Sequence, residues 1–132
     1  MSRMLAMILL TAMLSAGCVP RHAIAPTPVL PHTFAIQMKT HPTYPAQMDG
    51  TQFQAQIADK GSRPVSRAAV SISLAMPGMD MGRNVVTLKE MAATPGTYTG
   101  MGRFTMSGNW QATVSADRGT VHQSQVFPIV VH

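Results

Sequence analysis

Residues 70–76 read Val-Ser-Ile-Ser-Leu-Ala-Met, so that apolar side chains at every second position alternate with small or polar ones. A period of two places one side of an extended chain against a core and the other in water, which is typical of a half-buried β-strand. Pro77 and Gly78 follow directly, and both residue types end strands in turns. The stretch therefore predicts a strand over residues 70–76 that leads into a tight loop.

The same alternation recurs in six further segments, which turn signals separate from one another. These segments are residues 34–38, 52–57, 84–89, 97–106, 110–116 and 121–131. In the last one the apolar phase shifts near Gln125, and Pro128 indicates a sheet edge because proline cannot donate to a β-ladder. No window has the period of a helix. We therefore predict an all-β fold, an immunoglobulin-like two-sheet sandwich of about seven antiparallel strands.

The first seventeen residues have the parts of a secretory signal: a cation at Arg3, a short apolar run and small residues before a cleavage site. The run from Leu5 to Leu14 has about ten residues, half of what a membrane-spanning helix needs. The string Leu14-Ser15-Ala16-Gly17-Cys18 resembles a bacterial lipobox, in which a peptidase cuts before a lipid-carrying cysteine. Cys18 is the only cysteine. A lone thiol has no disulfide partner, which favours lipidation over an ordinary signal with a chance cysteine.

The lipobox resemblance implies a mature protein whose acylated Cys18 binds a lipid bilayer. Residues 18–32 then form a lipidated, proline-rich tether, since four prolines favour an extended spacer. The alternative is a segment that wraps over the domain. Val19 stands where lipoproteins of the inner membrane usually carry Asp, so the outer membrane is favoured. We expect residues 33–132 to form one domain at the periplasmic face of the cell envelope.

The charge distribution argues against one class of function, and the absence of catalytic motifs argues against another. The chain has ten Lys and Arg against five Asp and Glu, a formal net charge of +5, and the cations are scattered rather than grouped. No nucleic-acid partner is therefore predicted. The sequence has no Gly-x-Ser-x-Gly elbow, no phosphate-binding loop and no His-Glu-x-x-His motif. Since no two of the five acids form a motif that suggests an acid/base pair, we predict that the protein is not an enzyme.

Methionine is used heavily, with twelve in the chain and eight beyond the predicted signal, at positions 38, 48, 76, 79, 81, 91, 101 and 106. If seven strands follow one another antiparallel, the first, third and fifth connections share one end of the sandwich with the C-terminus. That end receives His41 and Met48, the loop over residues 76–82, Met106 and His132. Three connections that are remote in sequence thus bring thioethers to one end.

The loop Met76-Pro77-Gly78-Met79-Asp80-Met81-Gly82 is the clearest candidate for a binding site. In an extended loop, Met79 and Met81 point the same way because they are two residues apart, and Met106 can supply a third sulfur. Thioethers are soft donors that suit Cu(I). They need no deprotonation and cannot form disulfides in an oxidising envelope. We therefore predict a Cu(I) site of Met79, Met81 and Met106, with Met76 supporting the loop.

Packing is the alternative explanation for these methionines. Methionine is a flexible gap-filler, and the end of a sandwich has to be closed by some side chain. Met76 continues the apolar face of its strand, which favours core packing for this residue. His41 and His132 are either additional ligands or solvated loop residues.

The stretch MPGMDM, followed by PGTYTGMGRFTMSGNW, resembles the YtkA-like domain family, which is related to the FixH family. The shared pattern is Met-Pro-x-Met, Gly-x-Tyr and Met-x-Gly-x-Trp, here at Met76, Pro77, Met79, Gly96, Tyr98, Met106, Gly108 and Trp110. The resemblance covers about residues 33–131. It implies an immunoglobulin-type sandwich in copper homeostasis or oxidase assembly, with an efflux, oxidase or other copper-handling protein of the envelope as partner.

One departure from the family pattern concerns the loop. Many members have a histidine just after Met-Pro-x-Met, where this chain has Met81-Gly82-Arg83-Asn84. Either Met81 replaces the histidine or the site is lost here. Tyr98 and Trp110 are predicted to be core aromatics. The leading hypothesis is thus an anchored protein that captures or transfers Cu(I). The alternatives are a metal-free interaction or assembly module of an envelope complex, and a structural lipoprotein whose methionines contact lipid.

Overall fold

The computed structural model describes residues 34–132. The predicted signal (1–17), Cys18 and the tether (18–32) lie outside the described residues. The domain consists of seven strands: β1 (Phe34–His41), β2 (Gly50–Asp59), β3 (Ala69–Ala75), β4 (Val85–Glu90), β5 (Thr97–Arg103), β6 (Gly108–Arg118) and β7 (Val121–Val131). Every segment predicted from the alternation of residues is a strand, and the described residues include no helix.

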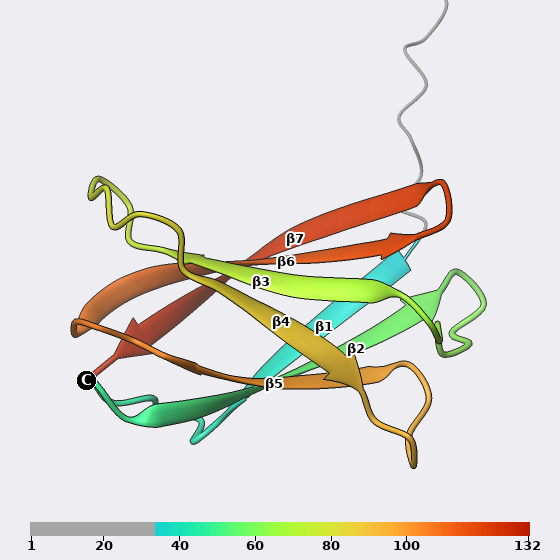
Figure 1. Cartoon of the computed structure of the whole chain (residues 1–132), viewed down its shortest axis with the longest axis horizontal. Helices are drawn as coiled ribbons and strands as arrows, with labels where there is room; N and C mark the ends of the chain where they lie inside the picture. The colour runs from blue at the N-terminus through green and yellow to red at the C-terminus, as the bar shows by residue number, and fades with distance from the viewer. Residues whose placement is uncertain (1–33) are drawn as a thin grey trace, which may run out of the picture.

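The strands are hydrogen-bonded in the order β1-β2-β5-β4-β3-β6-β7, and every pair is antiparallel. Two layers result, one of β1, β2 and β5 and the other of β3, β6 and β7 (Figure 1). Strand β4 joins them, because it pairs with β3 and then, through Lys89 and Glu90, with β5. β1 and β7 are the two ends of this order, and no ladder joins them within residues 34–132. The predicted immunoglobulin-like sandwich is confirmed.

Inward-facing side chains of both layers form one core. Its largest fully buried members include Trp110, Tyr98, Phe53 and Phe104, so the two predicted core aromatics are confirmed. Phe104 packs between the other rings, with its centroid 5.7 Å from Phe53 and 5.3 Å from Trp110. Within the described residues, this core extends from Phe34 in β1 to Val131 in β7, so the segment has a continuous core of its own.

Two details of the predicted strands are wrong. β5 ends at Arg103 rather than at residue 106, because the chain turns over Phe104–Ser107 while Phe104 is inserted into the core. β7 keeps one phase along its length, and its register with β6 is unbroken from Val121 to Val131. The change of phase predicted near Gln125 reflects outward-facing Val126 and Val130, which are each 53% exposed.

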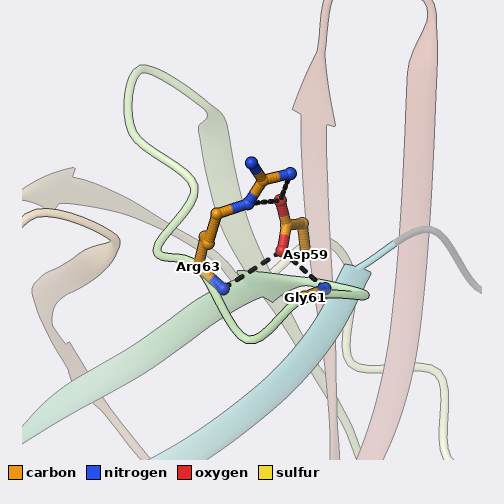
Figure 2. A network of polar contacts seen from close by, with 3 residues as sticks. All are labelled: Asp59, Gly61 and Arg63. Carbon is orange, nitrogen blue, oxygen red and sulfur yellow. Dashed lines mark hydrogen bonds and ion pairs between the residues drawn. The ribbon is translucent and has the colours of Figure 1, made fainter.

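The connection after β2 is closed by a polar network around Asp59 (Figure 2). The carboxylate of Asp59 accepts hydrogen bonds from the backbone N–H groups of Gly61 (2.8 Å) and Arg63 (3.0 Å). It also accepts the Nε–H of Arg63 at 2.9 Å and forms an ion pair with the same guanidinium at 2.9 Å. These contacts, above all the backbone N–H of Arg63, hold the pKa of Asp59 below its ordinary value of 3.8.

Glu90 has a similar role at the end of β4. Its carboxylate accepts the backbone N–H of Gly96 and that of Arg67, each at 3.0 Å. These bonds, that of Gly96 first, lower its pKa from the ordinary value of 4.5. Both carboxylates thus connect segments at the same end of the sandwich.

We expect the domain to lose stability in acid through these two groups. Because their pKa values are lower in the folded than in the unfolded state, their contribution is complete above the ordinary values and is lost as the pH falls through the folded values. The melting temperature should therefore fall as the pH drops below the ordinary carboxylate pKa values of 4.5 and 3.8. Asp59→Asn with Glu90→Gln should flatten this dependence, and an unchanged slope in the double variant would contradict the assignment.

Candidate metal centre

One end of the sandwich, here called the Met pole, consists of residues 42–49, 76–84 and 104–107 together with His132. It lies at the left in Figure 1, the side that holds the β1–β2, β3–β4 and β5–β6 connections and the C-terminus. Backbone hydrogen bonds link the β1–β2 connection to the β5–β6 turn and to the C-terminus. The N–H of Met48 donates to the carbonyl of Phe104, and that of Gln47 to the carbonyl of His132, both at 2.8 Å. The prediction that these connections share one end of the sandwich is confirmed.

The β3–β4 connection reaches the β5–β6 turn at two points. The side-chain amide of Asn84 donates to the carbonyl of Arg103 at 3.4 Å. The methyl of Met76 lies against Gly108, where a Cβ would be only 3.3 Å from Met76 Cε. Gly108 also has a φ of 126°, which disfavours side chains. The Met76 and Gly108 positions of the sequence motif are therefore in contact.

The four predicted methionines differ in their surroundings. Met76, Met81 and Met106 are half-buried and pack against the core. Met79 is 53% exposed, at the tip of a turn in which its N–H donates to the carbonyl of Met76 at 3.1 Å. Packing thus accounts for part of the surface of three side chains and leaves Met79 largely in solvent.

Trp110 fixes the turn that carries Met106. Its indole Nε1–H donates to the carbonyl of Met106 at 3.0 Å, while its ring is buried and contacts Phe104 edge-on. The Met-x-Gly-x-Trp part of the motif is therefore one structural unit: the tryptophan holds the turn, and Gly108 leaves room for Met76 from the neighbouring loop.

The two predicted histidine candidates are placed differently from the methionines. The ring of His132 lies 6.2 Å from the exposed ring of Tyr44 in an edge-to-face arrangement. His41 lines a groove of about 530 Å³ between the edges of β1 and β7, together with Met38, Tyr44 and Phe127. None of the four predicted methionines lines this groove.

Two features were not predicted from the sequence: the backbone conformation of Met48, and the inward position of Thr51 next to the Met pole. Met48 is 53% exposed and has a φ of 65°, which is uncommon for a residue with a side chain. Thr51 faces inward near the start of β2, and its buried hydroxyl has no hydrogen-bond partner among the described residues. The alternation of Thr51 with Phe53 and Ala55 was the available signal for its inward position.

Ordinary metal ligands do not cluster in the part of the chain that is described. Residues 34–132 contain no group of three or more His, Cys, Asp or Glu side chains arranged to hold a metal ion. In the same residues, no helix is long and apolar enough to cross a membrane.

Comparison with known proteins identifies a family. The model of the family described as YtkA-like matches residues 32–115, from just before β1 into β6. No curated protein shows significant sequence similarity to the chain.

Two solved structures have a similar fold. The C-terminal domain of ZirS has a TM-score of 0.51 at 14% identity, over 96% of this chain and 87% of that one. A DUF4785 family protein from Legionella pneumophila has a TM-score of 0.53 at 11% identity, over 75% of this chain. This chain spans only 29% of the length of the Legionella protein. At these identities, the two likenesses concern the fold alone.

Proposed function

This chain belongs to the YtkA-like family, and on that basis we propose that it is an extracytoplasmic Cu(I)-binding protein that captures or hands on copper through its Met pole. The ligands are Met79, Met81 and Met106, and Met76 supports the loop. The observation that supports the proposal is the position of Met79, which is 53% exposed on the β3–β4 loop, two residues from the half-buried Met81. Core packing alone gives no reason for an exposed methionine there.

The chemistry of the side chains suits this role. Neutral thioethers favour a soft monovalent ion such as Cu(I) over harder divalent ions. Two or three thioethers at the edge of a domain form an open site, and an open site allows copper to pass to a partner. That partner is an envelope copper-handling, efflux or oxidase-assembly protein, and the domain itself has no enzymatic activity.

The N-terminal residues supply the location in this proposal. Residues 1–17 direct export, the acylated Cys18 binds the bilayer, and residues 18–32 hold the domain at the periplasmic face, with the outer membrane favoured. Replacing Cys18 with serine should move the protein from the membrane fraction of cells to the soluble periplasmic fraction. A variant that stays in the membrane fraction would refute the lipid anchor and leave the Met pole unaffected.

A titration of the domain from residue 33 with Cu(I), in competition with a colorimetric chelator, tests the function. We expect the domain to compete for one equivalent of Cu(I) at micromolar chelator. The double variant Met79→Leu/Met81→Leu should lose this competition, while Met38→Leu/Met91→Leu, which also removes two thioethers but outside the Met pole, should retain it. No competition by the wild-type domain, or an unchanged affinity in the first double variant, would refute the proposal.

A metal-free interaction module is the second candidate function, and the exposure of the pole favours it. Tyr44 is 74% exposed, and Met48 and Met79 are each 53% exposed, so the same end offers an adaptable apolar surface. Leucine keeps the apolar surface and removes only the sulfur. Leucine variants should therefore keep this function and lose a copper function, and the same set of proteins distinguishes the two.

A further inference from the structure

The outer face of the layer formed by β4, β3, β6 and β7 is uncharged over most of its area. The register aligns outward-facing residues in rows that cross the strands, the first being Val85, Ser73, Thr113 and Val126. The next row, on the side away from the Met pole, consists of Thr87, Ser71, Ser115 and Ser124. Toward the Met pole the rows continue with Ala75, Gln111 and Pro128, then with Asn109 and Val130. We call these residues the neutral face.

The composition of the neutral face is unusual for this chain. None of its residues is charged, although the chain has a net charge of +5. Three of its side chains are valines that are more than half exposed: Val85 at 55%, and Val126 and Val130 at 53% each. Charged side chains border these rows at Lys89, the next outward-facing residue of β4 after Thr87, and at Asp117, which is hydrogen-bonded to His122. The outer face of the other layer, in contrast, includes Lys39 and Arg103.

We propose that the neutral face is a homodimer interface, occupied by the same face of a second copy. Two copies of a cationic chain repel each other least where neither carries a charge. Each row of one copy also matches the same row of the second copy. With a two-fold axis along the strands, between β3 and β6, Val85 of one copy meets Val126 of the other, and Ser73 meets Thr113. Valines thus meet valines at both ends of the row, and hydroxyls, which both donate and accept hydrogen bonds, meet in the middle.

The area of the neutral face indicates the range in which the dissociation constant of the dimer lies. The thirteen positions of the face, each about 4.8 Å by 6.7 Å, give roughly 420 Å² on each copy and about 840 Å² in total. That total is in the range of weak, transient interfaces, so the dissociation constant should be on the order of 100 µM. Short side chains keep the face flat enough for the close stacking of two sheets.

The same axis gives the dimer a definite orientation. A two-fold rotation about the strand direction keeps the two Met poles at one end of the dimer. It keeps Phe34 of each copy, where β1 begins, at the other end. Both copies can then be attached to one membrane, and both poles point away from it. The interface leaves the methionine connections free, so the dimer does not depend on copper binding.

Sedimentation velocity on the domain from residue 33, between about 5 and 500 µM, tests the proposal, because this range brackets the expected constant. We expect a reversible monomer–dimer equilibrium in the wild-type domain. Ser73→Lys should weaken it at least tenfold, since the new lysines of the two copies meet near the axis. Val126→Lys should do the same from an exposed position at the edge of the sandwich, with less risk to folding.

Gln52→Lys is the matched control, because it adds the same charge at an exposed position of β2 on the other layer. Its dimer should be as strong as that of the wild type. Circular dichroism and a thermal melt on each variant establish that it is folded. A wild-type domain that stays monomeric up to about 500 µM, a concentration well above the expected dissociation constant, would overturn the proposal. So would dimers of Ser73→Lys and Val126→Lys as strong as the wild type, or equal weakening by Gln52→Lys.

Discussion

Replacing Trp110 with alanine is expected to lower the free energy of unfolding by about 3 to 5 kcal/mol. The indole is 1% exposed, contacts Phe104, and donates its Nε1–H to the carbonyl of Met106. Alanine leaves a large cavity between the layers and leaves that carbonyl without its donor. Chemical denaturation followed by circular dichroism is the suitable measurement, because Trp110 is the only tryptophan and the substitution removes the intrinsic fluorescence probe.

Trp110→Phe separates the two roles of the indole. Phenylalanine keeps part of the packing on Phe104 but cannot donate to Met106, so it should cost less stability than alanine. If the hydrogen bond positions Met106 for the metal, Cu(I) affinity should fall in this variant although the domain stays folded. A loss below about 1 kcal/mol in Trp110→Ala would contradict the packing described here.

Substitution of one methionine in each of two connections should show that they bind the same ion. We expect Met79→Leu and Met106→Leu each to weaken Cu(I) binding on the order of 100-fold, since each removes a direct ligand. The double variant should be weaker than either, but by less than the product of the two effects. Non-additivity of this kind is expected only for residues that share a partner.

Met91→Leu is the control for this series, because Met91 follows β4 at the end of the sandwich opposite the Met pole. It should bind Cu(I) like the wild type. Strictly additive effects of Met79→Leu and Met106→Leu would mean that the two thioethers do not act on one ion, and would limit the site to the β3–β4 loop.

The strand pattern of this fold could be predicted because each strand has one buried face. Val70, Ile72 and Leu74 show this directly in the sequence and are all buried. The prediction was wrong where that rule has exceptions. Phe104 is buried after the end of β5, and Val126 and Val130 are apolar but point outward. Periodicity alone does not distinguish an exposed valine from a core valine, and in this protein the exposed ones lie on the neutral face.

The Met pole was predictable to the level of segments but not of side chains. Strand order places the three connections at one end, and the hydrogen bonds from Met48 and Asn84 link two of them to the segment around Phe104. Whether a methionine is exposed depends on the turn in which it lies, and Met79 and Met81 differ in exposure although they are two residues apart. The contact of Met76 with Gly108 needed the fold, because it joins positions on different connections.

Methyl NMR of the domain labelled on its methionine methyl groups is the most direct measurement of convergence at one ion. Addition of Cu(I), or of Ag(I) as a stable substitute, is predicted to shift the signals of Met79, Met81 and Met106 together, with saturation at one equivalent. The signals of Met38 and Met91 should not move. Shifts confined to one connection, shifts that saturate at different equivalents, or no shift at all would contradict a shared thioether site at the Met pole.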